Sequence, residues 1–407
     1  MENRKWFKTY MFIWAGQFAS MLTSYAVQFA IVIWLSLEYK SAEVLAYAGI
    51  AAMLPQALIG LIAGVYVDRL NRKYVMIFSD AFIAVCALVL LVILQNENVN
   101  LIWIYVLLGL RSIGNAFHTP ALQAIAPLIV PQSELIKVAG INQVLHSVCS
   151  IGGPAIGTLA IAYLPISMVL YLDLIGALLA ILSLVMVKIP DLVTKSKSSI
   201  HSITTDFLEG FQTISKNKGL RYLFLYAMAI TFIMMPAAIM FPLLTTGHYA
   251  GGKWEMGVIE VVWGGGMLIG GAILSTFKLK GSKVVAVNVM YVLLGLTFIL
   301  SGALPASWFV GFVLTTAIGG ISLSVFNGCF TAIVQTEVSP DKLGRVFSLY
   351  YSLAVLPSVI GLLFTGLIAE VIGVNITFII SGCLAILVGI LSFSTRNLMQ
   401  LDKIKNV

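Results

Sequence analysis

The sequence predicts an all-α integral membrane protein whose twelve transmembrane helices form two bundles of six, with both termini in the cytoplasm. The first observation is composition: 60% of the 407 residues are hydrophobic and 10% are charged, whereas a soluble domain carries about 25% charged residues. The second is that the apolar runs reach the roughly 20 residues of a membrane-spanning helix and do not alternate with polar residues as barrel strands do. The third is an internal repeat that relates the two halves.

Twelve apolar segments follow one another along the chain. The seventh contains Pro236 and Pro242, which are predicted to break it because proline removes a helix hydrogen bond. The segments are residues 10–37, 43–67, 75–95, 100–126, 138–163, 166–187, 221–246, 255–277, 283–303, 307–333, 345–369 and 374–395.

A polar stretch, residues 188–220, separates the sixth and seventh segments. It is rich in Ser and Lys and becomes amphipathic from Asp206 to Ser215. These properties predict a cytoplasmic linker with a short surface helix. The linker divides the chain into an N-terminal six-helix bundle, residues 1–187, and a C-terminal six-helix bundle, residues 221–407.

An internal repeat supports this division. One ungapped shift of 208 residues aligns Lys137 with Arg345 and Gly153 with Gly361, together with several apolar positions. Apolar matches alone are common between membrane segments. The evidence for the repeat is therefore that the same shift also aligns a basic residue and a glycine. Six-helix repeats of this kind are typical of transporters.

The basic residues fall on one predicted side of the membrane. With both termini inside, all but three of the 24 Lys and Arg residues lie in cytoplasmic segments; Lys40 and Lys253 lie outside, and Arg111 lies within a span. Because Lys and Arg in short loops stay on the cytoplasmic side, this bias predicts the orientation. It also accounts for the net charge of +7 without a nucleic-acid partner.

A short charged hinge joins the second and third segments and is predicted to act as a gate at the cytoplasmic surface. It resembles the loop between helices 2 and 3 of the major facilitator superfamily. Asn71 stands where that family usually has a second glycine, and Asn tolerates the left-handed backbone region. The matching residues, together with a carboxylate predicted to brace their cations, are Gly64, Asp68, Arg69, Arg72, Lys73 and Asp80.

The resemblance extends to two further motifs. Arg111 lies midway along the fourth segment, where a charge needs a cavity or a partner, and the family's arginine in this motif takes part in proton coupling. The alternative interpretation is a structural ion pair with a carboxylate of the same half. Gly153, Pro154 and Gly157 resemble the antiporter signature in the fifth helix of drug exporters, which shapes the contact between the halves.

Two carboxylates inside the spans are candidates for proton coupling. Burial raises the pKa of a carboxyl group, so that it binds and releases protons in a useful range. Glu260 ranks slightly ahead of Asp173, because the eighth helix flanks the cavity in this superfamily. The alternatives are a solvated outer-rim position for Glu260 and a helix-bracing hydrogen bond for Asp173. His118 and His146 are interpreted as hydrogen-bonded core residues.

The first, fourth, seventh and tenth helices line the substrate cavity in the same superfamily. No two of the four cysteines have metal-ligand spacing, and neither a metal nor a cofactor is expected. The resemblance assigns six polar or flexible side chains to the cavity: Gln17, Thr23, Gln28, Asn115, Met235 and Asn327.

Four strings narrow the resemblance to the macrolide-efflux proteins of Gram-positive bacteria: residues 13–17, 111–114 with 116–122, 266–271 and 344–349. The resemblance implies proton-driven export of amphipathic, macrolide-type drugs across the bacterial plasma membrane, by a monomer embedded in the lipid bilayer. The alternatives are a proton-coupled uptake permease for a small apolar or amphipathic solute and an integral-membrane enzyme that modifies lipids. A pump driven by ATP is excluded, because the sequence has no phosphate-binding loop motif.

Overall fold

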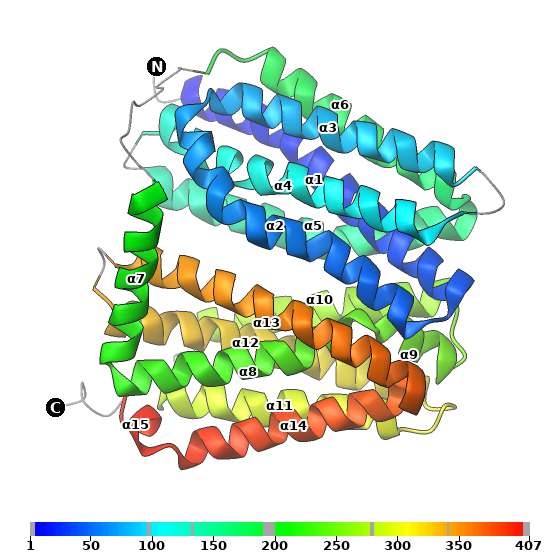
Figure 1. Cartoon of the computed structure of the whole chain (residues 1–407), viewed down its shortest axis with the longest axis vertical. Coiled ribbons are helices and arrows are strands. Elements are labelled where there is room, and N and C mark those ends of the chain that lie inside the picture. The colour runs from blue at the N-terminus through cyan, green and yellow to red at the C-terminus, as the bar shows by residue number, and fades with distance from the viewer. Residues whose placement is uncertain are drawn as a thin grey trace. The chain divides into compact units, whose positions relative to one another are not determined.

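The computed structural model describes residues 5–95, 99–131, 134–189, 200–276, 281–339 and 342–401. Every regular element in these ranges is a helix, which confirms the all-α prediction for this part of the chain. The chain divides into two compact units, drawn in Figure 1. The N-terminal unit is Met1–Glu38 with Tyr47–Ser199, and the C-terminal unit is Tyr39–Ala46 with Ile200–Val407.

Six helices build the N-terminal unit, and each begins and ends within a few residues of a predicted apolar segment. Within it, α3 packs against both α4 and α6. The helices are α1 (Lys5–Tyr39), α2 (Ala42–Arg69), α3 (Arg72–Ile93), α4 (Leu101–Ile129), α5 (Leu135–Tyr163) and α6 (Ile166–Val185).

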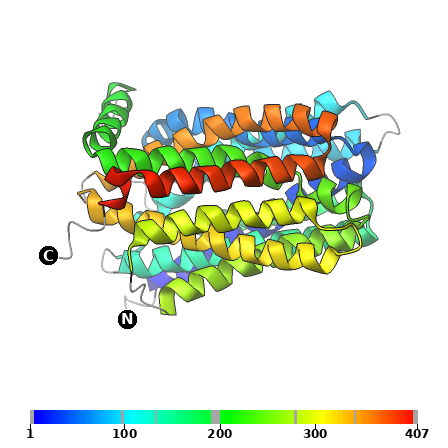
Figure 2. The same ribbon diagram turned by 90° about the horizontal axis from the view of Figure 1, so that it is seen from below.

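Apart from Tyr39–Ala46, the C-terminal unit runs from α7 (Ile200–Lys216), an amphipathic helix that contacts α8 and α13. Figure 2 shows α7 set at an angle to one end of α8, while α14 runs alongside α8. The remaining helices are α8 (Lys218–Ile239), α9 (Phe241–Gly247), α10 (Lys253–Thr276), α11 (Lys283–Ala303), α12 (Phe309–Glu337), α13 (Leu343–Ile372), α14 (Val374–Ser394) and α15 (Arg396–Met399).

Eleven helices in the described ranges are long and apolar enough to cross a membrane. The remaining predicted span, residues 345–369, corresponds to α13, in which the apolar stretch Pro357–Ile372 is shorter than a full span. Apolar side chains on the outside of the helices are widely exposed, and on α6 they recur at helical spacing at Met168, Ile175, Leu178 and Leu182. Such a continuous apolar surface suits lipid rather than water.

The helix boundaries repeat along the chain. A shift of 208 residues carries α4 onto α12 at both ends, and α6 onto α14 to within one residue. The packing repeats too, since α3 contacts α4 and α6 while α11 contacts α12 and α14. The two units are therefore two copies of one six-helix pattern, and residues 208 apart occupy corresponding places.

The seventh predicted span is interrupted at one of its two prolines. α8 ends at Ile239, and α9 begins at Phe241 with Pro242 in its first turn, where a proline loses no hydrogen bond. The prediction that Pro236 breaks the helix is wrong, because Pro236 lies inside α8. Its ring is buried in contact range of Gly361 on α13, so tertiary packing holds the helix together there.

Close helix contacts in the N-terminal unit depend on glycines. A methyl group added at Gly157 of α5 would lie 2.3 Å from the carbonyl oxygen of Ala26 on α1. A methyl group at Gly153 would lie 2.4 Å from the Cβ atom of Tyr25. Both glycines thus let α5 approach the backbone of α1, as small residues do in membrane proteins.

We expect Gly157→Ala to destabilise the protein by about 1–3 kcal/mol, since the methyl group forces α1 and α5 apart. Gly60→Ala in α2 is the matched control, because within the described structure no atom outside the adjacent helix backbone lies within 4 Å of a methyl group added there. The control should match the wild type or gain up to about 1 kcal/mol from helix propensity. Thermal unfolding in detergent measures both; equal midpoints for the two variants would contradict the packing proposed for Gly157.

Candidate functional site

A buried ion pair joins α4 to α6 inside the N-terminal unit. The Arg111 side chain donates through Nη1 to Oδ2 of Asp173, and the two residues are 5% and 3% exposed. The Ser24 hydroxyl of α1 donates to the other carboxylate oxygen, Oδ1, at 2.7 Å. With both groups charged the pair is neutral overall, and each charge has the hydrogen-bonded partner that burial requires. The partner of Arg111 is thus a carboxylate of its own half.

A second buried polar cluster joins α1, α3 and α4. His118 Nε2 lies 3.0 Å from Oε1 of Gln17 and 3.3 Å from Oδ1 of Asp80. The Gln17 amide nitrogen lies 3.5 Å from Asp80 Oδ2, which closes the triangle. Gln17 has no exposed surface, Asp80 is 3% exposed and His118 is 9% exposed. His118 therefore belongs to an ionisable cluster rather than to an apolar core.

The two clusters lie at different depths of the same helices. Ser24 follows Gln17 by seven residues on α1, and Arg111 precedes His118 by seven residues on α4. Seven residues are two helical turns, or about 10 Å along a helix. The N-terminal unit thus contains two buried polar clusters at different depths, separated by about two helical turns on α1 and α4.

Glu260 lies in the C-terminal unit on α10, where its side chain is half-buried. Among the described residues it has no hydrogen-bond or ion-pair partner. Glu255, which precedes it by five residues, acts at the start of the helix, where its carboxylate accepts the Gly252 N–H at 2.7 Å. Glu260 is therefore the carboxylate of this span that has no partner in the described structure.

In the charged hinge between α2 and α3, the side chain of Asn71 caps the start of α3. Asn71 has φ −66° and ψ 110°, and its Oδ1 accepts the N–H groups of Lys73 and Tyr74 at 3.1 and 3.4 Å. The expectation that Asn71 serves through the left-handed region is thus wrong; it serves as an N-cap, a position that Asn favours.

The hinge cations reach backbone carbonyl groups. Lys73 Nζ donates to Val187 O at 2.7 Å and to Val185 O at 3.4 Å, beside the C-terminus of α6, where a cation is favourable. Arg72 donates to Ala124 O at 3.3 Å. Gly64, Asp68 and Arg69 lie in α2, but their side-chain positions fall outside the described structure.

Asp80 lies deeper than its predicted bracing role requires. It follows Arg72 by eight residues on α3, which is about 12 Å along a helix. Within the described structure its partners are Gln17 and His118. The antiporter motif makes its described contacts within the N-terminal unit. Gly153 and Gly157 contact α1, and Pro154, which follows Gly153, is buried.

The predicted cavity residues separate into three groups by their exposure. Gln28, Asn115 and Asn327 expose their amides on membrane-length helices, which is costly in lipid and favourable in a water-filled path. Met235 is half-buried, and Thr23 is half-buried with its hydroxyl bonded to the carbonyls of Ala19 and Ser20. Gln17 does not line a cavity in this structure, because it is fully buried in the cluster with Asp80 and His118.

Sequence reasoning missed two exposed polar residues on α4. Thr119 and Gln123 follow Asn115 at intervals of four residues, and all three side chains are exposed. The interval places them on one face of the helix. The four-residue spacing of polar residues in an apolar segment is the sequence signal that could have identified this polar face of α4. Ser24, the hydrogen-bond partner of Asp173, had no comparable signal.

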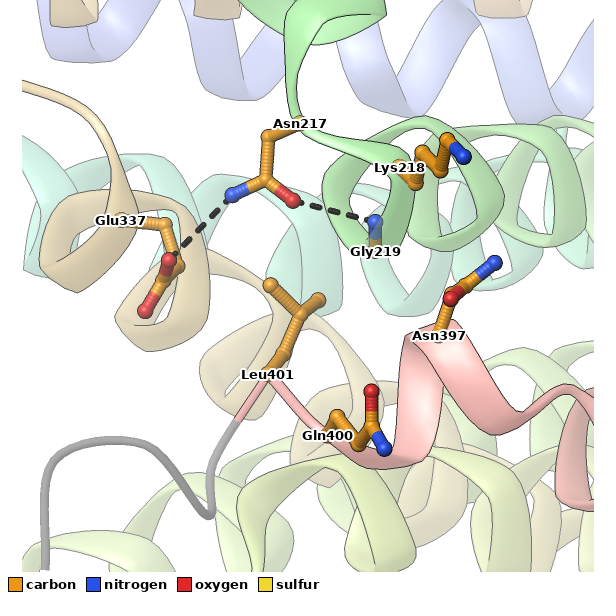
Figure 3. Close-up of a pocket in the computed structure, with 7 residues that line it drawn as sticks. All are labelled: Asn217, Lys218, Gly219, Glu337, Asn397, Gln400 and Leu401. Atoms are coloured by element: carbon orange, nitrogen blue, oxygen red, sulfur yellow. Dashed lines mark hydrogen bonds between the residues drawn. The ribbon is translucent and has the colours of Figure 1, made fainter.

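A separate hollow of about 210 Å³ lies in the C-terminal unit, at the N-terminus of α8 and beside α15 (Figure 3). The Asn217 side chain caps α8 by accepting from Gly219 N at 3.0 Å and donates to Glu337 at 3.4 Å. Gly219 lies against Leu401 so closely that an added methyl group would be 2.5 Å from its Cγ. These contacts hold α8, α12 and the C-terminal segment together, and we assign them a structural role.

Membrane-length helices in two repeated units, with buried charges and exposed amides inside the spans, define a multi-pass membrane protein. The sequence profile of the Major Facilitator Superfamily matches residues 13–290. The chain belongs to this family and is a multi-pass protein of the cell membrane.

Two relatives and one solved structure extend the comparison. The chain is 36% identical to macrolide efflux protein A of Streptococcus pyogenes over 401 residues, which cover 98% of this chain and 99% of the relative. It is 35% identical to macrolide efflux protein A of Enterococcus faecalis, with 76% and 96% covered. The crystal structure of a point mutant of the nucleoside transporter NupG shares the fold with a TM-score of 0.76, at 14% identity and 95% and 99% coverage.

Proposed function

We propose that this protein is a drug efflux transporter that exports macrolide-type, amphipathic antibiotics in exchange for protons. The observation that carries the proposal is its similarity to macrolide efflux protein A, which extends over nearly the full length of both chains. The protein works as a monomer without a cofactor. Two six-helix bundles, residues 1–187 and 221–407, alternate access to a central site and are joined by the linker 188–220.

Protons couple to export through carboxylates in the spans. Glu260 is first in rank, because it is a half-buried carboxylate with no partner in the described structure and can gain and lose a proton without breaking an ion pair found there. Asp173 is second, because its carboxylate is bound to Arg111 and Ser24. The ion pair with the Arg111 guanidinium must break before Asp173 can bind a proton. Arg111 sets the charge balance of this exchange.

The substrate path follows the helices with exposed amides. Gln28 of α1, Asn115 of α4 and Asn327 of α12 supply hydrogen-bonding groups, and Met235 of α8 supplies a flexible apolar surface. Thr119 and Gln123 extend the polar face of α4. A few polar groups on a largely apolar wall suit amphipathic molecules of varied shape.

The charged hinge between α2 and α3 serves as the cytoplasmic gate, with Asp68, Arg69, Arg72 and Lys73 as its charged members. We expect Asp68→Asn to lower export several-fold while expression stays near normal, because the substitution keeps the size of the side chain and removes the charge that holds the gate. Transport by equal amounts of the two proteins measures the effect. Full export by this variant would remove Asp68 from the gate.

The proposed function is tested with purified protein in liposomes under an imposed pH gradient. For one proton per drug, a gradient of about one pH unit corresponds to about 1.4 kcal/mol and supports about tenfold accumulation. We expect a labelled macrolide to accumulate in the compartment from which protons leave. Accumulation with the opposite direction would indicate the uptake permease, and no response to the gradient for any macrolide would refute proton-driven macrolide export.

A further inference from the structure

The cluster of Gln17, Asp80 and His118 is the strongest group of buried ionisable side chains that the proposed coupling residues do not include. Its members come from three helices, and all three are at least nine-tenths buried. A carboxylate and an imidazole inside a membrane bundle are costly unless they serve one another or bind a ligand. We propose that this cluster binds one exchangeable proton, at a site distinct from both Glu260 and the Arg111–Asp173 pair.

The hydrogen bonds place the proton. Nε2 of His118 faces two acceptors, Gln17 Oε1 at 3.0 Å and Asp80 Oδ1 at 3.3 Å, so Nε2 carries hydrogen and donates to them. With a neutral ring and an ionised Asp80 the cluster has a charge of −1. An added proton goes to Nδ1, the ring becomes an imidazolium, and the cluster becomes neutral overall. Burial favours the neutral form, because net charge is expensive in apolar surroundings.

The surroundings contain few competing charges. On α4, Arg111 is two turns away and is paired with Asp173 of α6. On α3, Arg72 and Lys73 lie about two turns away at the hinge and donate to backbone carbonyls.

The other helices to consider are α1, which contributes Gln17 to the cluster, and α2, whose Val67 packs with Ile13 and Met76. On α1 the nearest titratable group is Tyr10, two turns away, whose hydroxyl bonds to Asn142 of α5. On α2 the charged groups are Asp68 and Arg69, whose side-chain positions lie outside the described structure. Within the described structure, the carboxylate that contacts His118 is therefore Asp80 alone.

An apolar layer separates the cluster from the hinge. Ile13 and Met76 lie one turn from Gln17 and Asp80, and Ala121 lies one turn from His118. These three residues pack together in one core cluster and have at most 1% exposed surface. A proton held by His118 is thus shielded on the side that the charge bias predicts to be cytoplasmic, and its release requires this layer to open.

The repeat shows that the cluster is not a general requirement of the fold. The residues 208 positions later are Leu225, Asn288 and Phe326, none of which can exchange a proton near neutral pH. Asn288 is buried like Asp80, and Phe326 packs against Tyr291 of the same helix pair. Since the C-terminal unit folds without charge at these places, the ionisable groups of the N-terminal unit serve something besides folding.

The proton site rests on the proposed function for its role in transport, but its existence can be measured directly. We suggest ¹⁵N NMR of histidine-labelled protein in lipid, from about pH 5 to about pH 9, which brackets ordinary and shifted imidazoles. The His118 signal is the one that His118→Gln removes. His146→Gln is the matched control, since His146 lies in the same unit and its ring bonds to Tyr25 at 3.1 Å.

We expect the His118 ring to change protonation state within this range. In Asp80→Asn the midpoint should move to lower pH by at least about one unit, a tenfold loss of proton affinity, because the anion that stabilises the imidazolium is gone. A ring that stays in one state throughout, or an unchanged midpoint in Asp80→Asn, would overturn the proton site.

Transport in the same liposomes separates this inference from the proposed function. His118→Gln should change the pH profile of uphill export, while exchange without a gradient and the profile of His146→Gln stay as in the wild type. An unchanged profile in His118→Gln would remove the cluster from coupling. Titration of His118 in a wild-type protein without proton-driven export would refute the proposed function and leave the proton site in place.

Discussion

Glu260→Gln should abolish uphill export and leave exchange intact. The amide mimics a permanently protonated carboxyl group, so the variant can bind drug and move it down a gradient but cannot return a proton. In liposomes with a gradient of about one pH unit, accumulation should fall from about tenfold to about onefold. Exchange of labelled for unlabelled drug without a gradient should stay within about twofold of the wild type, since a single isosteric change keeps the path.

Two controls make this result specific to Glu260. Glu255→Gln should retain uphill export, because Glu255 caps the start of the same helix through the Gly252 N–H. Asp173→Asn tests the competing carboxylate in the same assay. If Glu260→Gln accumulates drug like the wild type and Asp173→Asn does not, the ranking of the two carboxylates is reversed. If both accumulate drug like the wild type, neither carboxylate couples export to protons.

Arg111→Ala should have the largest effect on folding of any single substitution considered for this protein. It leaves the buried Asp173 carboxylate with the Ser24 hydroxyl as its neutral hydrogen-bond partner. Removing one member of a buried ion pair costs about 3–5 kcal/mol, so the yield of folded protein and its unfolding midpoint should both fall. Arg111→Lys should recover only part of the loss, because an ammonium group lacks the planar guanidinium fork.

The double substitution Arg111→Gln with Asp173→Asn separates folding from coupling. It removes both charges together, and a buried pair replaced as a unit often costs little stability. We expect the unfolding midpoint to return toward the wild type while uphill export remains lost. Recovery of both would show that the pair only stabilises the bundle, and recovery of neither would show that its charges are required for the fold itself.

The positions of the spans could be predicted from the sequence, because a membrane helix requires about 20 consecutive apolar residues wherever its neighbours lie. α4, α6 and α11 begin within a residue of the predicted segments. Local chemistry was less reliable where tertiary contacts intervene. Pro236 remains inside α8 because Gly361 of α13 leaves room for its ring, and Asn71 caps α3 instead of adopting a left-handed turn.

The sequence by itself determined the class of fold, the family motifs and the presence of charges inside the spans. It identified Arg111, Asp173 and Glu260 as residues that need an explanation, since an apolar run makes any charge within it conspicuous. Only the tertiary structure decided their partners. Arg111 and Asp173 are 62 residues apart in the chain, and hydropathy reports the depth of a residue in the membrane but not the side of its helix or the neighbour it meets.

The same limit explains the cluster of Gln17, Asp80 and His118. Each residue alone was open to another interpretation: a cavity amide, a brace for the hinge and a core histidine. Their meeting depends on the rotation of α1, α3 and α4 about their axes, which the packing of Ile13, Met76 and Ala121 sets one turn away. Side chains from three helices meet only when each helix is rotated so that its side chain faces the other two. These rotations are set by helix packing in the bundle and cannot be read from any one segment.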